Sequence, residues 1–224
     1  MAIYAIGDIH GCDTALRTLW TQLNPQAGDT VVCLGDYVDR GPCSMEAIDF
    51  LLSKTNETQL IFIKGNHDIM MLEARENLSD LAEWLRHGGE NSLDSYGVED
   101  ESKWKQHIPA THWDFLQHSL PYHRIRSYLF VHGGLDAGVA LVDQSESVLY
   151  WEKQYEPKPY SEEYTVICGH TSRRNGEIAD FGHTICIDTY AYGGMWLTGL
   201  NVETKEFVQT NEKGEFKRGQ LGIT

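Results

Sequence analysis

The sequence predicts a mixed α/β protein in which two packed, mixed β-sheets are flanked by helices. One observation behind this prediction is the alternation of short apolar runs and helical patterns over residues 1–65, in the order β-α-β-α-β. The other is a series of short apolar runs after residue 120, a pattern typical of a mostly antiparallel sheet. Because each sheet must cover its apolar face, we expect the two halves of the chain to supply two sheets that pack together.

The first half of the chain contains three predicted strands separated by two predicted helices. The strands are short apolar runs bounded by glycine or polar residues, at residues 3–6, 31–35 and 60–65. The first helix, over 12–23, has apolar residues at helical spacing, namely Leu16, Leu19, Trp20 and Leu23. The second, over 44–52, points four apolar residues inward: Ala47, Ile48, Leu51 and Leu52.

Each of these three strands ends in a polar turn. The turns read GDIHG at 7–11, GDYVDRG at 35–41 and GNHD at 65–68. Turns favour Gly, Asp and Asn, so one such turn alone would indicate only a change of chain direction. Since the ligands of α/β sheets bind at the carboxyl ends of strands, three such turns together predict one shared site.

The rest of the chain is predicted to begin with a helical stretch over 67–87. Residues 88–120 look like an insertion or cap within a single domain spanning 1–224, because they are rich in loop and aromatic residues. The runs YHRIR and YLFVHGG predict a hairpin across Ser127. Three later apolar runs predict further strands, at 164–170, 183–189 and 195–204.

The composition is ordinary for a globular protein, with 41% hydrophobic and 23% charged residues among 224. A formal charge of −15 argues against a nucleic-acid partner, because polyanions repel one another, but it does not exclude a phosphorylated substrate held by local cations. We expect no signal peptide and no membrane association, since the chain has no basic leader region and no apolar run of about 20 residues. Five cysteines, three of them in or beside apolar runs, predict free thiols and a cytoplasmic location.

Seven polar side chains with the chemistry of metal ligands lie at strand ends. They are Asp8, His10, Asp36, Asn66, His67, His132 and His170. Carboxylate, imidazole and amide groups suit two divalent transition-metal ions, with Mn expected and Fe or Zn as alternatives. Two ions that share Asp36 would use six of the seven groups as ligands, and His67 would not bind a metal. Such a pair of ions activates a water and stabilises the oxygens of an in-line phosphoryl displacement.

The motifs resemble the signature of the metallophosphoesterases, and most of all that of the phosphoprotein phosphatase branch. GDIHG, GDYVDRG and GNHD occur in the family's order and spacing, and VHGG at 131–134 and CGHT at 168–171 also match. That branch includes small bacterial Ser/Thr protein phosphatases and diadenosine tetraphosphate hydrolases. The resemblance therefore implies a metallophosphoesterase-like β-sandwich with metal-dependent hydrolase activity.

The resemblance also implies a role for each motif residue. Six residues would be metal ligands: Asp8 and His10 for the first metal, Asp36 as the bridge, and Asn66, His132 and His170 for the second. His67 would protonate the leaving group, and Asp39 would orient the imidazole and keep it protonated near neutral pH. Arg40 would bind the phosphate through its planar donor fork.

Three departures from the family pattern leave the substrate open. Small bacterial members usually carry Trp-x-Arg after the VHGG strand, whereas this chain has Lys153 at the position of the arginine. Lys153 would then bind the phosphate as a point charge, unless Arg173 or Arg174 takes that role. The family's GHTP is GHTS here, and its Asp-Thr-Gly is DTY at 188–190.

We expect the protein to hydrolyse phosphomonoesters on protein serine or threonine, or on tyrosine, by direct attack of a metal-bridging hydroxide. The alternative substrate is a dinucleoside polyphosphate such as diadenosine tetraphosphate. Two other classes stay open. One is a binding scaffold of the same fold without turnover, and the other is a cysteine-dependent phosphatase built on Cys168 and Arg174, which have the spacing C-x5-R.

Overall fold

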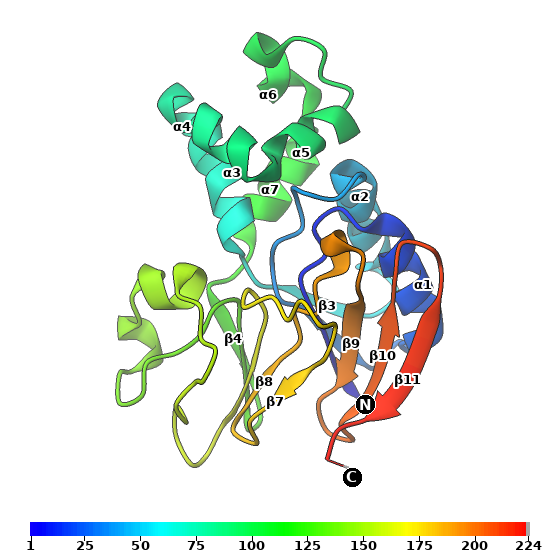
Figure 1. The fold of residues 1–224 in the computed structure, drawn as a ribbon, viewed down its shortest axis with the longest axis vertical. Coiled ribbons are helices and arrows are strands. Elements are labelled where there is room, and N and C mark those ends of the chain that lie inside the picture. The colour runs from blue at the N-terminus through cyan, green and yellow to red at the C-terminus, as the bar shows by residue number, and fades with distance from the viewer. Residues whose placement is uncertain (223–224) are drawn as a thin grey trace.

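The computed structural model describes residues 1–222, which form two β-sheets packed against each other with helices outside them (Figure 1). The first sheet has six strands in the order β11-β10-β9-β1-β2-β3, and the second has five in the order β4-β5-β6-β8-β7. Both sheets contain parallel and antiparallel pairs. The predicted fold class is therefore confirmed.

The six strands of the first sheet come from both ends of the chain. They are β1 (Ile3–Ile6), β2 (Thr30–Cys33), β3 (Gln59–Phe62), β9 (Leu197–Asn201), β10 (Glu206–Thr210) and β11 (Phe216–Gln220). β1 and β2 are parallel, as are β2 and β3, whereas β9 lies antiparallel to β1 with Asn201 opposite Tyr4. The prediction that the strand at 195–204 belongs to a second-half sheet is wrong, because β9 satisfies the edge of β1 that β2 leaves unpaired.

The second sheet consists of β4 (Tyr122–Ile125), β5 (Tyr128–Val131), β6 (Thr165–Cys168), β7 (Ala179–Asp180) and β8 (Thr184–Cys186). The hairpin across Ser127 is confirmed, with Ile125 opposite Tyr128. The prediction of a mostly antiparallel sheet is wrong, because β5, β6 and β8 are parallel neighbours. The long connection over 132–164 returns the chain to the same end of the sheet, as a parallel pair requires.

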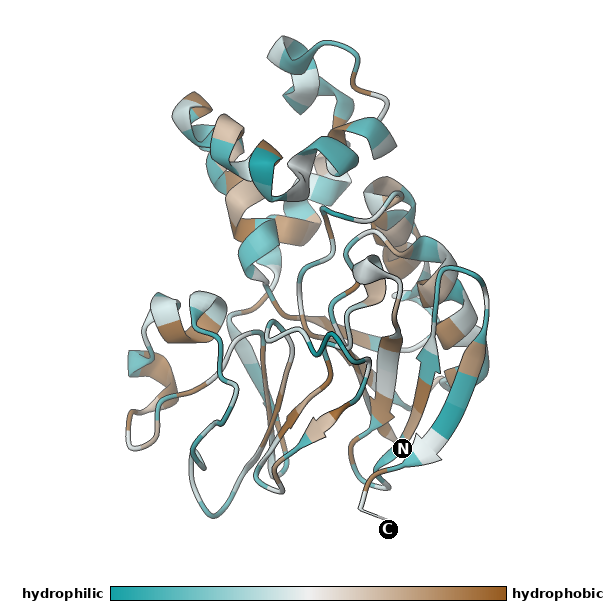
Figure 2. Cartoon of the chain, viewed as in Figure 1, coloured by the Kyte–Doolittle hydropathy of each residue, from teal (hydrophilic) through white to brown (hydrophobic). Residues whose placement is uncertain are grey.

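The two faces of the first sheet belong to two different cores. Along β1, Ile3 and Ala5 point toward the second sheet and pack in one buried cluster with Ile167 and Ile185. Ile6 points the other way, into the cluster that the helices cover. Each fully buried aliphatic side chain of this kind contributes about 1.5–3 kcal/mol to stability. In Figure 2 hydrophobic colour runs along the inner strands, whereas hydrophilic colour covers much of the edge strand β11.

Two of the predicted helices cover the outer face of the first sheet. α1 (Asp13–Leu23) and α2 (Ser44–Lys54) are confirmed, and Leu16, Leu19 and Leu51 of these helices are fully buried. The five cysteines are all free thiols, as predicted. Among residues 1–222 the longest helices have 11 residues, and none has the length and hydropathy needed to cross a membrane.

A second group of helices gathers at the end of the molecule where β3 runs into α3 (Figure 1). It contains α3 (Asn66–Glu76), α4 (Leu78–Trp84), a π-helical turn (Leu85–Gly89), α5 (Glu90–Ser95), a 3-10 turn (Glu101–Lys103), α6 (Trp104–His107) and α7 (Ala110–His118). Residues 88–120 are thus more helical than their loop-rich composition indicated. Their helices pack around three indoles in tilted and edge-to-face contact, with ring centroids of Trp84 and Trp104 4.9 Å apart and of Trp104 and Trp113 5.5 Å apart. The single domain and the cap role of this segment stay predictions.

Candidate active site and metal centre

The three polar turns meet at the carboxyl ends of β1, β2 and β3. The backbone N–H of His10 donates to the carbonyl of Asp36 at 2.7 Å, which ties the first turn to the second. The carboxylate of Asp68 ties the second turn to the third, because it accepts from the backbone N–H groups of Gly65 (2.8 Å), Asp36 (3.0 Å) and Tyr37 (3.0 Å). Sequence analysis missed Asp68, although an acid at the third position of a helix is a recognised capping signal.

Backbone strain is concentrated at this end of the sheets. Five residues without glycine's freedom have φ values between 46° and 72°, namely His10, Asp36, Asp39, Arg40 and His170. Each such conformation costs about 1–3 kcal/mol, so the surrounding hydrogen bonds and packing must hold it. The strained residues coincide with the predicted site residues, which indicates that folding places these side chains against local backbone preference.

Asp36 lies between two clusters of histidines. Its Oδ2 is 3.3 Å from Nε2 of His10, and its Oδ1 is 3.4 Å from Nε2 of His132. The ligand atoms of His10, Asp36 and His67 lie within 4.8 Å of one another, and so do those of Asp36, His132 and His170. Burial acts to raise the pKa of Asp36, but the adjacent His132 and His67 outweigh it and lower that pKa well below its ordinary value. One ionised carboxylate therefore faces both clusters.

The second cluster brings several lone pairs together. Nδ1 of His132 lies 2.8 Å from the carbonyl oxygen of Leu34, and Nε2 of His170 lies 3.0 Å from that of Trp151. Because a carbonyl oxygen only accepts, these nitrogens carry the protons, and the other nitrogen of each neutral ring carries a lone pair. Both lone pairs point at Oδ1 of Asn66, at 3.0 Å from His132 and 2.9 Å from His170. Converging acceptors of this kind fit a bound cation.

The first cluster is oriented in the same way. Nδ1 of His10 lies 2.9 Å from the carbonyl oxygen of Val38, so Nε2 carries the lone pair that faces Asp36. This Nε2 also accepts from Nη1 of Arg40 at 3.0 Å. A backbone carbonyl behind a ligating imidazole holds its tautomer and ring orientation, and the donor set of the first cluster therefore also fits a divalent ion.

Asp8, the other predicted ligand, is buried beside these clusters but belongs to neither of them. Its carboxylate accepts from the backbone N–H of His170 at 3.0 and 3.2 Å. Burial, followed by the charges of Asp188 and Asp36, raises the pKa of Asp8 well above its usual range. A side chain at position 169 has no room, because a Cβ on Gly169 would lie 2.0 Å from Oδ1 of Asp8. The acidic surroundings of Asp8 also favour a nearby cation.

His67, a member of the first cluster, forms a buried pair with Asp39. Nδ1 of His67 lies 2.8 Å from Oδ2 of Asp39. The other oxygen of this carboxylate, Oδ1, accepts from Oγ of Ser92 at 2.7 Å and from Nε1 of Trp84 at 2.9 Å. Sequence analysis missed Ser92 and Trp84, because nothing local in the helical segment signals a contact with the GDYVDRG turn.

Burial opposes charge on both members of this pair. Burial raises the pKa of Asp39 to about 7 and lowers the pKa of His67 well below its ordinary value. Burial therefore opposes the imidazolium form of His67, and the contact with Asp39 is the interaction that can hold a second proton on the ring. Desolvation disfavours charge on both partners, and it outweighs their mutual attraction.

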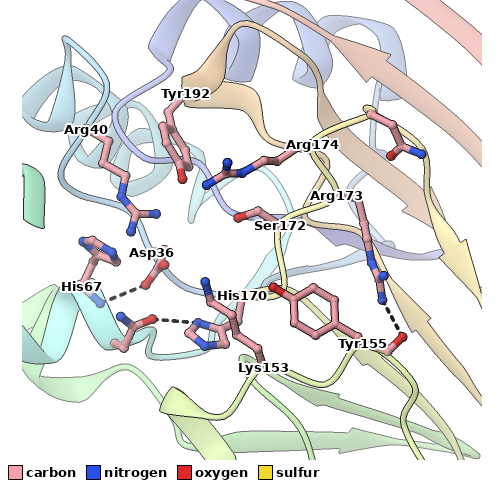
Figure 3. A pocket seen from close by; sticks show the side chains of 12 residues that line it. Asp36, Arg40, His67, Lys153, Tyr155, His170, Ser172, Arg173, Arg174 and Tyr192 are labelled. Carbon is pink, nitrogen blue, oxygen red and sulfur yellow. Dashed lines mark hydrogen bonds between the residues drawn. The ribbon is translucent and has the colours of Figure 1, made fainter.

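A cavity of about 530 Å³, which we call the cationic cavity, opens beside the two clusters (Figure 3). Four cationic side chains line it: Arg40, Lys153, Arg173 and Arg174. In Figure 3 the guanidinium of Arg174 points into the cavity toward Tyr192, whereas Arg173 turns away and donates to the carbonyl of Tyr155 at 3.3 Å. All three candidates for the second phosphate-binding cation thus line one cavity, but Arg174 is directed into it and Arg173 is not.

Cys168 does not have the surroundings of a reactive thiolate. It lies at the end of β6 with 4% of its surface exposed. A hydrogen bond with Cys186 and burial raise its pKa well above the ordinary value. A nucleophilic cysteine needs the opposite, namely a lowered pKa and an accessible sulfur. The cysteine-dependent alternative therefore has no support in the geometry.

The three turns and the two later histidine loops lie within a segment that matches a known family. The profile of the calcineurin-like phosphoesterases matches residues 1–199. A Burkholderia thailandensis protein named symmetrical bis(5'-nucleosyl)-tetraphosphatase is 30% identical over 61% of this chain and 45% of its own length. A Neisseria meningitidis protein of the same name is 28% identical over 96% of this chain and 97% of its own length. The chain thus spans less than half of the first relative and nearly all of the second.

Solved structures share the fold at low identity. One that was assigned provisionally as a diadenosine tetraphosphatase has a TM-score of 0.68 at 20% identity, over 99% of this chain and 94% of that chain. A cold-active protein tyrosine phosphatase has the same TM-score at 17% identity, over 96% of this chain and 78% of that chain. The motif resemblance is confirmed by the profile match, and the chain belongs to the calcineurin-like phosphoesterase family, a family of phosphoester-hydrolysing enzymes.

Proposed function

We propose that the protein hydrolyses a dinucleoside polyphosphate such as diadenosine tetraphosphate. The observation that carries this proposal is the gathering of four cationic side chains around one cavity in a protein with a formal charge of −15. A single phosphate on a protein side chain needs only part of this set, whereas a chain of linked phosphates can engage more of it, including Arg174. The names of the Burkholderia and Neisseria relatives support the same choice. The substrate favoured by sequence alone, a phosphoprotein, becomes the second candidate.

Two divalent metal ions belong to this proposal, with Mn as first choice and Fe or Zn as alternatives. The residues that would hold them are Asp8, His10, Asp36, Asn66, His132 and His170. The lone pairs of His10, His132 and His170 converge on Asp36 and Asn66, which is the physical reason for assigning these five, whereas Asp8 is included because of its burial beside them and the motif resemblance. When bound, such ions supply Lewis-acid polarisation of a phosphoryl group and a water of lowered pKa.

The other residues bind the phosphates and manage a proton. Arg40 and Arg174 are placed to hold non-bridging oxygens, with Lys153 as a third cation at the same cavity. Hydrolysis forms a bond from water oxygen to phosphorus and breaks the bond from phosphorus to the bridging oxygen, which leaves with the electron pair. Nε2 of His67 is the group that would protonate a poor leaving group, and Asp39 orients the ring through Nδ1.

The second candidate, a phosphoprotein substrate, has one observation in its favour. The His67–Asp39 pair is fully assembled, with two further donors holding the carboxylate in place. An alkoxide leaving group from serine or threonine needs protonation by such an acid, whereas a phosphate leaving group is stable as an anion. Leaving-group dependence therefore separates the two candidates.

The experiment is a comparison of kcat/KM for diadenosine tetraphosphate and a panel of phosphoserine, phosphothreonine and phosphotyrosine peptides, with Mn present. The proposal expects the dinucleotide to be the better substrate, with products resolved by ion-exchange chromatography. Asp36→Asn serves as the control for contaminating phosphatases. A phosphopeptide that is turned over faster than the dinucleotide would reverse the order of the two candidates.

A further inference from the structure

A second cavity adjoins the two histidine clusters. It has a volume of about 440 Å³ and is bounded by α3 and α4. It shares five lining residues with the cationic cavity: Arg40, Asn66, His67, Lys153 and His170. The two cavities therefore meet at the candidate reaction centre, and one elongated molecule could extend into both.

Three of the seven residues that line only the second cavity carry carboxylates, one of which, Glu83, also pairs with Arg86 and His87. Glu73, Asp80 and Glu83 contribute carboxylates, so we call this space the acidic cavity. Burial, followed by the charges of Asp80 and Glu146, raises the pKa of Glu73 above its ordinary value. Such a wall repels a phosphate chain but accepts hydrogen bonds from the amino group of a neutral molecule.

The acidic cavity also has aromatic and thioether walls. Met70, Trp84 and Trp151 line it, and Trp151 is 42% exposed although it stands beside a buried centre. The backbone of Trp151 is held in place, because its carbonyl oxygen accepts from Nε2 of His170 at 3.0 Å. An accessible indole on an anchored backbone is a suitable platform for a flat heterocycle.

We propose that the acidic cavity binds one nucleoside half of the substrate, with its base stacked on the indole of Trp151. This inference rests on the proposed function, because it places one nucleoside end of a dinucleoside polyphosphate in the acidic cavity. The phosphate chain then occupies the cationic cavity, and the bond that breaks lies at the five residues that the two cavities share. Opposite charges on the two sides orient the substrate, since only the uncharged nucleoside tolerates the carboxylate wall.

The test compares Trp151→Ala, Trp151→Phe and a control, Val142→Ala. Val142 is 82% exposed on the same connection between β5 and β6 and lines neither cavity. Loss of one base stack should raise KM for diadenosine tetraphosphate roughly 5- to 150-fold in Trp151→Ala, with most of the loss restored by Trp151→Phe. The control should behave like the wild type.

A ligand without a base separates stacking from general damage. The inhibition constant of tripolyphosphate should stay within about twofold of wild type in Trp151→Ala, because the cationic cavity is intact. An unchanged KM for the dinucleotide in Trp151→Ala, or an equal rise in the tripolyphosphate constant, would overturn the inference.

A binding measurement keeps the inference separate from the proposed function. Adenosine should quench part of the tryptophan fluorescence of the metal-free protein saturably, and Trp151→Phe should lose that part. If wild type fails to hydrolyse diadenosine tetraphosphate yet shows this quenching, the proposed function fails while the nucleoside site stands. If hydrolysis occurs but the quenching is the same in wild type and Trp151→Phe, the nucleoside site fails and the proposed function stands.

Discussion

The carboxylate of Asp68 accepts the backbone N–H of Asp36 at 3.0 Å, although the two residues follow different strands. The same carboxylate accepts from Tyr37 and Gly65, so it joins the loops after β2 and β3. Asp36 is thereby held in a left-handed conformation, with φ of 51°, between the two histidine clusters. Asp68, which is itself buried, thus positions Asp36, the carboxylate on which the proposed metal centre depends.

Asp68→Asn should destabilise the protein and loosen this centre. An amide oxygen can replace only part of the acceptor capacity, and each lost hydrogen bond to a charged group is worth about 1.5–3 kcal/mol. We expect a loss of that order in the free energy of unfolding, measured by urea denaturation, together with weaker Mn binding in calorimetry. Asp114→Asn, on the exposed surface of α7, is the control. Equal stability of the two variants would contradict the role given to Asp68.

Asp36→Asn should remove nearly all activity and both metal ions. The physical reason is that Oδ2 faces His10 and Oδ1 faces His132, so one neutral amide weakens both clusters at once. Metal content by plasma mass spectrometry and kcat/KM on the preferred substrate are the measurements. Two ions bound at near-normal turnover would show that Asp36 is not the shared ligand.

His67→Asn should lower turnover according to the leaving group. For a phosphoserine peptide we expect a loss of roughly 10²–10⁴-fold, as for removal of a general acid, with metal content close to wild type. The loss should be smaller for nitrophenyl phosphate and for diadenosine tetraphosphate, whose leaving groups need less protonation. The measurement is kcat for the three substrates, and an equal loss on all of them would rule out the acid role.

The cationic side chains that line the cationic cavity should contribute unequally to kcat/KM. Arg40 adjoins the centre, within 3.0 Å of His10, so Arg40→Ala should lower kcat/KM roughly 100- to 1,000-fold, as when an oxyanion donor is lost. Lys153→Ala should cost about 1 kcal/mol, mostly in KM, since a flexible ammonium cannot bind bidentately.

The two arginines after the GHTS motif provide a matched pair. Arg174 points into the cavity, whereas Arg173 is engaged by the carbonyl of Tyr155. Arg174→Ala should therefore raise KM for diadenosine tetraphosphate more than Arg173→Ala does. Steady-state kinetics of the four variants on one substrate would decide, and a loss in Arg173→Ala that exceeds the loss in Arg174→Ala would reverse this assignment.

Gly169→Ala should damage the site without removing a functional group. The new Cβ would lie 2.0 Å from Oδ1 of Asp8, so the carboxylate or the loop must move, at a cost of about 1–3 kcal/mol. Thermal denaturation and Mn affinity are the measurements. Gly28→Ala is the control, because its Cβ would meet no protein atom closer than 3.4 Å. Unaltered Mn affinity in Gly169→Ala would argue against Asp8 as a ligand.

Local sequence predicted the strands that carry the site and the residues at their ends. The strands β1 and β2 could be recognised because each is a short run of apolar residues. Gly, Asp and Asn then mark the turn that follows each run. The hairpin across Ser127 was predictable for the same reason. The residues His10, Asp36 and His132 could be singled out because each lies in a short motif of the family, namely GDIHG, GDYVDRG and VHGG. The single domain and the cytoplasmic location stay predictions.

Tertiary structure decided everything that depends on contacts between distant segments. No local pattern shows that Asn201 lies opposite Tyr4, or that β5 and β6 are parallel, because strands of similar composition can pair in several orders. Trp84 and Ser92 support Asp39 from helices that lie distant from it in the sequence, and Trp84 also packs against the indole of Trp104. The opposite charges of the two cavities likewise depend on tertiary structure, because each cavity is lined by residues from segments that are far apart in the sequence. The charge of a surface depends on which segments pack together and not on their order in the chain.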